Sequence, residues 1–224
     1  MLLRGLPLYT GIAPAIAVSL AYWLGISSEV LPACIPLLDG CTSISATGRY
    51  MPGSLLFRAI MLPQAFVLAM LWYLSSKWLS ALSDIDRSDK TLLAFGLFGA
   101  LALVTYVTFL GTKAPFYELM RRFGIYFYFL GTAVAQLTLA LSLLKIAAQR
   151  ADAALRRYAV TMLWLCGLPF ALGVLLSFLK ETLENADFAE NRIEWISALF
   201  MQAYFVVLYL AWRSTRISVS VRVD

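Results

Sequence analysis

Long apolar runs separated by short polar connections make up most of this chain. A helix needs about 20 mostly apolar residues to cross roughly 30 Å of hydrocarbon. Six runs approach or reach that length, at about residues 7–25, 54–76, 92–112, 123–146, 158–179 and 194–212. The sequence lacks the series of alternating strands that is typical of a membrane barrel. The pattern therefore predicts an all-α membrane protein, built as a bundle of six transmembrane helices.

The composition agrees with a single membrane domain. Hydrophobic residues make up 61% of the chain, above the roughly 45–50% of soluble domains. The connections are too short to form a separate soluble unit, so we treat residues 1–224 as one transmembrane domain. The net charge of +5 fits basic cytoplasmic connections, and we expect no nucleic acid among the partners. We expect the protein in a bacterial inner membrane or a eukaryotic secretory-pathway membrane.

Lysine and arginine are unevenly divided between the two sides that six crossings define. With the N-terminus inside, eleven lie on the cytoplasmic side and six on the outer side, and Arg58 is left out of the count. The cytoplasmic group is Arg4, Lys77, Arg87, Lys90, Lys145, Arg150, Arg156, Arg157, Arg213, Arg216 and Arg222; the outer group is Arg49, Lys113, Arg121, Arg122, Lys180 and Arg192. Because cytoplasmic connections carry an excess of these residues, both termini are predicted to be cytoplasmic.

The connection at about residues 26–53 is the longest and has an unusual composition. It is half apolar, carries few charges and is rich in small residues, whereas disordered segments are polar and charged. We expect it to fold onto the outer face of the bundle, with Leu37 and Leu38 protected from solvent. The alternative is an interfacial spacer. Cys34 and Cys41 both fall in this connection, so they form either a disulfide, if it faces an oxidising compartment, or two partly buried free thiols.

Several catalytic chemistries are excluded by residue type. The chain contains no histidine, which excludes a Ser-His-Asp triad, a Cys-His dyad and a His-ligated zinc ion. A phosphate-binding loop and a Cys-x-x-Cys pair are also absent from the sequence. We expect no metal site and no cofactor, and the spacing selects no catalytic nucleophile. Whether the protein is an enzyme stays open.

Ionisable residues gather at the predicted outer boundary of the membrane. A charge near hydrocarbon is expensive, so it usually pairs with another charge or serves a function. Arg58 with Glu118 or Glu194 would form such a pair, and the small residues of segment 43–48 would permit close approach of a ligand to the backbone. The candidate lipid-headgroup site is Arg58, Glu118, Glu194, Ser43, Ser45, Gly48 and Asp39. The alternative is a set of isolated helix-end charges that extend toward water.

Two stretches of the sequence resemble one family. The segment CTSISATG at residues 41–48, followed by Pro52 and by LFR ending at Arg58, is similar to the first lumenal loop and second helix of the DRAM/FRAG/SFK membrane proteins. The pair Glu194-Trp195 before an aromatic-rich span resembles the start of their sixth helix, and Gly124 is a weaker match. The resemblance covers essentially the whole chain and implies six helices with both ends cytoplasmic.

The same resemblance implies a function in lipid remodelling or in the regulation of other membrane proteins. The family includes autophagy modulators, a GPI-lipid-remodelling protein and the N-terminal domain of a GPI-ceramide remodelling protein. Several relatives carry a histidine shortly before the helix 4 glycine, where this chain has Arg121 and Arg122, so a histidine-dependent reaction does not carry over.

Three functions are therefore alternatives for this chain. The first is binding of a phospholipid or glycolipid headgroup on the outer side, with assistance to lipid remodelling or transfer. The second is a non-enzymatic adaptor or regulator whose partners are other membrane proteins. The third, a small-solute transporter, is disfavoured because the later helices carry few charges near the bilayer midplane.

Overall fold

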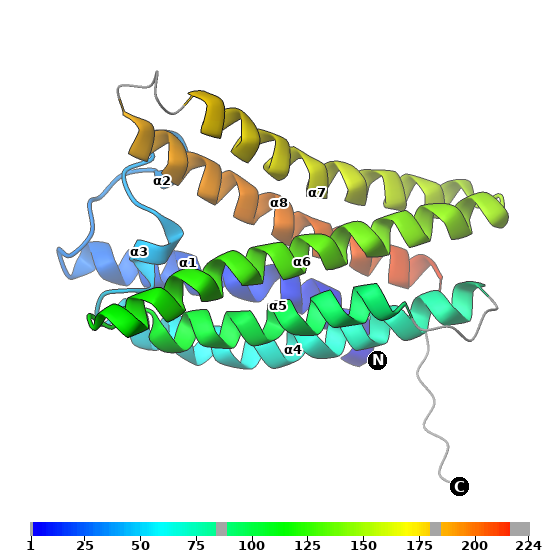
Figure 1. Ribbon diagram of the computed structural model, residues 1–224, viewed down its shortest axis with the longest axis horizontal. Helices are drawn as coiled ribbons and strands as arrows, with labels where there is room; N and C mark the ends of the chain where they lie inside the picture. The colour runs from blue at the N-terminus through cyan, green and yellow to red at the C-terminus, as the bar shows by residue number, and fades with distance from the viewer. Residues whose placement is uncertain (1, 84–88, 180–184, 216–224) are drawn as a thin grey trace, which may run out of the picture.

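Long helices form a bundle in the computed structural model (Figure 1), which describes residues 2–83, 89–179 and 185–215. Within these residues, six helices are long and apolar enough to cross a membrane. Within the described residues every regular element is helical, which confirms the all-α prediction. The elements are η1 Leu2–Gly5, α1 Leu6–Ser27, α2 Pro36–Asp39, α3 Ile44–Thr47, α4 Gly53–Ser83, α5 Lys90–Phe109, α6 Pro115–Gln149, α7 Ala153–Leu179 and α8 Ala186–Ser214.

Most long helices extend beyond the apolar runs from which they were predicted. Helix α6 begins at Pro115 rather than near residue 123, and α8 begins at Ala186 rather than near residue 194. Hydropathy marks only the apolar part of a helix, whereas the polar first turns continue the same backbone hydrogen bonding. Pro115 occupies the first turn of α6, where a missing N–H costs no helical hydrogen bond. As a result, Glu194 lies about two turns inside α8 rather than at its start.

Helices α5 and α6 approach each other through glycines. A Cβ atom on Gly131 would lie 2.8 Å from the Cα of Gly99, and one on Gly124 would lie 2.6 Å from the backbone nitrogen of Tyr106. Gly96 instead receives the indole of Trp72 from α4, because a Cβ there would lie 2.4 Å from that ring. The small-residue face of α5 therefore serves packing within the bundle, as small residues do in many membrane helices.

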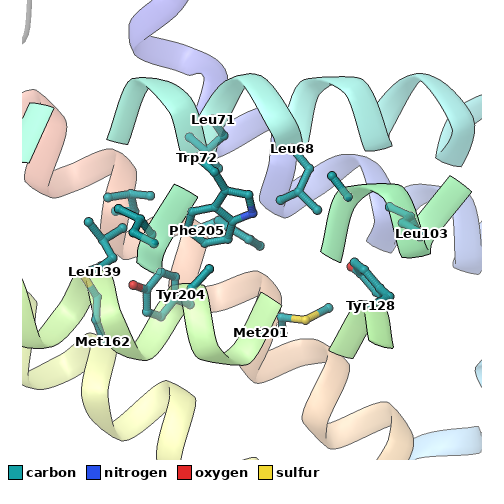
Figure 2. Close-up of a cluster of buried hydrophobic side chains, with 14 of the residues drawn as sticks. Leu68, Leu71, Trp72, Leu103, Tyr128, Leu139, Met162, Met201, Tyr204 and Phe205 are labelled. Atoms are coloured by element: carbon teal, nitrogen blue, oxygen red, sulfur yellow. The ribbon is translucent and has the colours of Figure 1, made fainter. Parts of the chain in front are cut away.

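Large buried side chains fill the middle of the bundle (Figure 2). The rings of Trp72 and Phe205 lie 5.8 Å apart between centroids. Tyr204 donates a hydrogen bond of 2.6 Å to the backbone carbonyl of Gln136, which links α8 to α6. The amide of Gln136 in turn donates to the carbonyl of Met201 at 3.3 Å. Both of these buried polar side chains thus find a main-chain partner on the neighbouring helix, as an interior without water favours.

A proline in α1 creates a second interhelical polar contact. Pro14 has no backbone N–H, so the carbonyl of Thr10 loses its donor within the helix. The amide of Gln64 in α4 donates to that carbonyl at 3.2 Å. The amide of Gln202 in α8 donates to the same carbonyl at 3.2 Å when its nitrogen faces α1. Three helices therefore meet around one carbonyl freed by proline.

The bundle is not uniform along its length. Helices α7 and α8 diverge from α5 and α6 toward the end that carries α2 and α3, and converge at the other (Figure 1). Helix α1 begins, and α8 ends, at the end away from α2 and α3. Arg87, Lys180, Arg216 and Arg222 of the charge count lie outside the described residues, and the cytoplasmic position of the termini stays a prediction.

That orientation can be tested with a membrane-impermeant maleimide. In a variant whose own cysteines are replaced, Ala151→Cys is expected to react from the cytoplasmic side, and Asn185→Cys only from the opposite side. Both positions are exposed at connections, so labelling reports the side and not burial. Reaction of Asn185→Cys from the cytoplasmic side would reverse the topology.

Candidate functional site

The connection between α1 and α4, called loop 1 here (residues 28–52), is fastened to the first turns of α8. The indole Nε1 of Trp195 donates to the carbonyl of Thr42 at 2.9 Å. The Nδ2 of Asn191 donates to the carbonyl of Gly40 at 2.8 Å. Gly40 has a φ of +68°, and a Cβ there would lie 2.1 Å from the carbonyl oxygen of Phe188. Only glycine satisfies both the left-handed backbone and the close approach to α8.

Loop 1 is also held by α1. The hydroxyl of Tyr22 lies 2.9 Å from the carbonyl of Cys34 and accepts from the backbone nitrogen of Cys34 at 3.1 Å. The rings of Tyr22 and Trp195 meet edge to face at 6.3 Å. Leu31 is buried and packs on Gly25. These contacts confirm that loop 1 folds onto the bundle.

The expectation for Leu38 was wrong. Leu38 is 63% exposed and Ile35 is 58% exposed, whereas Leu31 is only 9% exposed. The reason is the short helix α2. The backbone nitrogen of Ile35 donates to Oδ2 of Asp39 at 2.8 Å, and Pro36 is the buried residue of this turn. Asp39, a predicted site residue, therefore stabilises its own helical turn, and that turn presents Leu38 to the surroundings.

Cys34 and Cys41 are joined as a disulfide in the structure, with their Cα atoms 6.6 Å apart. The bond encloses α2. Cys166 is a free cysteine in α7.

Counting reactive thiols tests this assignment. Unfolded, unreduced protein is expected to take up one maleimide, on Cys166, and reduced protein is expected to take up three. Intact-mass spectrometry distinguishes the two adducts. Three maleimides on unreduced protein would show that loop 1 holds free thiols.

Glu194 meets loop 1 at the start of α3. Its Oε1 accepts from the backbone nitrogen of Ser45 at 3.3 Å. The hydroxyl of Ser45 shares a hydrogen bond of 3.1 Å with the hydroxyl of Tyr106 on α5. The side chain of Ser43 accepts from the nitrogen of Ala46 at 3.1 Å and so caps α3. A carboxylate, a serine and a tyrosine from three separate elements thus converge at one point.

Arginines lie close enough to act on this group. The charge of Arg49 acts electrostatically on both Glu194 and Tyr106, and that of Arg121 acts on Tyr106. The Nε atoms of Arg49 and Arg58 are buried and have no hydrogen-bond partner among the described residues. The site therefore combines one poorly solvated carboxylate with a nearby cation that still has an unused donor.

The other predicted site residues occupy separate places at the same end of the bundle. The Nη2 of Arg58 donates to the carbonyl of Leu110, where α5 ends, rather than to a carboxylate. Glu118 is exposed in the first turn of α6. Gly48 is buried, and a Cβ there would lie 2.8 Å from Leu110 and 2.9 Å from Phe57. The structure thus brings Ser43, Ser45 and Glu194 together, places Arg58 and Gly48 beside Leu110, and leaves Glu118 at the surface.

A mainly apolar cavity of about 100 Å³ lies beside Glu194, among helices α1, α4, α5, α6 and α8. Figure 2 shows three of its lining residues, Leu103, Tyr128 and Met201. The exposed side chains of Ser19 and Leu199 also line it, so it opens to the surface alongside α8. Its full lining is Pro14, Ala15, Val18, Ser19, Ile44, Phe57, Met61, Leu103, Tyr106, Ile125, Tyr128, Phe129, Glu194, Trp195, Ala198, Leu199, Met201 and Gln202.

Sequence reasoning missed the two tyrosines of this cavity. Tyr106 and Tyr128 are 2% and 6% exposed and lie in apolar runs, where an aromatic residue normally indicates core packing. The available signal was the hydroxyl itself, because a buried tyrosine usually has a hydrogen-bond partner. Tyr106 has Ser45, whereas no partner for the Tyr128 hydroxyl is recorded in the described part of the chain.

Comparison with known proteins identifies the family. A family profile described as the Frag1/DRAM/Sfk1/Cwh43P N-terminal domain matches residues 6–214. The chain belongs to this family. No curated protein and no solved structure gave a match. As a Frag1/DRAM family member whose described residues form six helices long and apolar enough to cross a membrane, it is an integral multi-pass membrane protein.

Proposed function

We propose that this Frag1/DRAM family protein binds the headgroup of a phospholipid or glycolipid in the cavity beside Glu194, and assists remodelling or transfer of that lipid. The observation that carries the proposal is a carboxylate facing a mainly apolar cavity that opens along α8. A soluble ligand would reach such a site from water, whereas a lipid reaches it from the side.

The position of the carboxylate supports a role in binding. A charge at membrane depth is costly and is usually retained for a function. One oxygen of Glu194 fastens loop 1 through Ser45, and the side chain also lines the cavity. The same residue therefore joins the closing loop to the interior, so occupancy of the cavity and docking of loop 1 are expected to support each other.

The lateral opening suits a molecule with a polar head and an apolar tail. Leu199 is 49% exposed on the outer face of α8, where acyl chains pack in a bilayer. The two tyrosines of the lining are buried, and Glu194 is half-buried. This order, apolar outside and polar inside, matches a headgroup that enters between helices while its chains remain in the membrane. The resemblance to GPI-lipid-remodelling relatives points the same way.

Lipid retention by the purified protein tests the proposal. The wild-type protein is expected to keep a bound lipid through detergent exchange. Glu194→Gln is expected to lower the affinity for that lipid at least about tenfold, since a charged hydrogen bond contributes roughly 1.5–3 kcal/mol. The glutamine can still accept from Ser45, so loop 1 stays docked. Native mass spectrometry measures the occupancy.

Asp187→Asn is the matched control. Asp187 is exposed in the first turn of the same helix, so the substitution removes the same charge away from the cavity and is expected to leave occupancy unchanged. Equal occupancy in the wild type and Glu194→Gln would contradict the proposal and favour the adaptor function.

A further inference from the structure

We infer that the group bound in the cavity is the ammonium end of a zwitterionic phospholipid headgroup, ethanolamine or choline. The inference rests on the lipid-binding function proposed above and specifies its ligand. It follows from the chemistry of the cavity wall, from the size of the cavity and from the arginine beside it.

The wall combines aromatic rings with a single carboxylate. Its aromatic members are Phe57, Tyr106, Tyr128, Phe129 and Trp195, and Glu194 is its only ionisable acid or base other than tyrosine. An ammonium over aromatic faces is attracted by the electron density of the rings, and more strongly where water is excluded. A carboxylate adds direct charge attraction. A phosphate alone would be repelled by Glu194, so the wall selects a cation.

The size of the cavity favours a small group. About 100 Å³ is available, and one water-sized group needs roughly 10–15 Å³ of such space. A group of roughly seven heavy atoms therefore fits, which covers an ethanolamine or choline end. A chain of sugars does not fit. Among the two lipid classes proposed above, this favours a phospholipid.

A positive charge near Glu194 also favours the negative group next to the ammonium. Arg49 acts electrostatically on Glu194, and its buried Nε has no hydrogen-bond partner among the described residues. In a zwitterionic headgroup the phosphate follows the ammonium after a two-carbon link. Arg49 is not among the residues that line the cavity, so its charge favours the phosphate through the local electrostatic field and not as a direct ligand. The hydroxyl of Tyr128, buried on the same wall, offers a further donor.

Competition among phospholipids with identical acyl chains tests the inference. Phosphatidylethanolamine, phosphatidylcholine and phosphatidylglycerol are offered in equal amounts in mixed micelles, and bound species are counted by native mass spectrometry. We expect the bound amount of at least one ammonium-bearing lipid, phosphatidylethanolamine or phosphatidylcholine, to exceed that of phosphatidylglycerol about tenfold. Glu194→Gln is expected to abolish this preference. Equal retention of phosphatidylglycerol by the wild type would overturn the inference but leave lipid binding intact. Retention of no lipid would overturn the proposed function itself.

A second pair of variants separates recognition from stability. Phe129→Leu removes an aromatic face from the cavity wall and keeps an apolar side chain, so it is expected to reduce the preference several-fold. Phe123→Leu changes an exposed phenylalanine of the same helix outside the cavity and is expected to have no effect. An unchanged preference in Phe129→Leu would contradict the aromatic contribution. Displacement of the lipid by equimolar glycerophosphocholine would show a soluble ligand and overturn the lipid assignment.

Discussion

Gly131→Val is expected to destabilise the bundle by about 3 kcal/mol, whereas Gly167→Val is expected to be tolerated. At Gly131 even the first added carbon would lie 2.8 Å from the Cα and the nitrogen of Gly99 and from the carbonyl oxygen of Phe95. All three are backbone atoms of α5, which cannot rotate away as a side chain can. Helices α5 and α6 would have to separate along their shared face.

The control isolates this effect. Gly167 is also a helical glycine, and a Cβ there has nothing within 4 Å. Both substitutions therefore change intrinsic helix propensity equally, and only Gly131→Val forces two backbones apart. Overpacking costs about 1–3 kcal/mol and occasionally more; we expect the upper end here. Thermal unfolding in detergent, followed by size-exclusion chromatography, measures the difference. Equal unfolding temperatures would contradict the close α5–α6 contact.

Arg58→Ala is expected to destabilise the protein by about 2–3 kcal/mol, because a charged hydrogen bond is lost and a buried carbonyl is left unpaired. Arg58 donates to the carbonyl of Leu110, a residue that is 0% exposed. The C-terminal end of α5 carries partial negative charge, which favours a cation there. The arginine thus stabilises the helix end against which Gly48 of loop 1 packs.

Arg156→Ala supplies the comparison, because Arg156 is exposed on α7 and such substitutions usually change stability by less than about 0.5 kcal/mol. Arg58→Lys is expected to recover part of the loss, since an ammonium can donate to one carbonyl. Urea or thermal unfolding measures all three variants. If Arg58→Ala and Arg156→Ala have the same unfolding midpoint, the contact with Leu110 contributes nothing to stability.

The helices could be predicted from the sequence because the backbone polar groups of a chain in hydrocarbon must hydrogen-bond to one another. Long apolar runs in lipid must be helical, and no distant contact is needed to see them. The polar ends were placed less well: α6 begins at Pro115 and α8 at Ala186, where hydropathy is low but helical hydrogen bonding continues.

The candidate site was predictable only in part, because charge type does not specify a partner. Glu194 was selected as a charge at membrane depth, and the structure places it against Ser45. Arg58 was expected beside a carboxylate and instead donates to the carbonyl of Leu110. This partner could not be predicted, because every residue type has a main-chain carbonyl and the sequence does not show which one lies at a helix end. Leu38 was expected inside because it is apolar, but the local turn of α2 exposes it.

Loop 1, the first turns of α8 and the cavity lie next to one another. Trp195, Asn191 and Glu194 hold loop 1 on α8, and the cavity lies directly behind that contact. A lipid that enters along α8 would therefore meet a site whose cover is fixed by the same helix. The family assignment establishes the membrane protein class, and the central claim beyond it is that the cavity binds a phospholipid headgroup.

An experimental density map of the protein in nanodiscs of mixed phospholipids, with a rigid antibody fragment bound for alignment, tests that claim most directly. We expect headgroup density inside the cavity, within hydrogen-bonding distance of Glu194, and acyl-chain density that leaves the cavity past Leu199. A cavity filled by the protein's own side chains, with ordered lipid only on the outer faces of the helices, would contradict it.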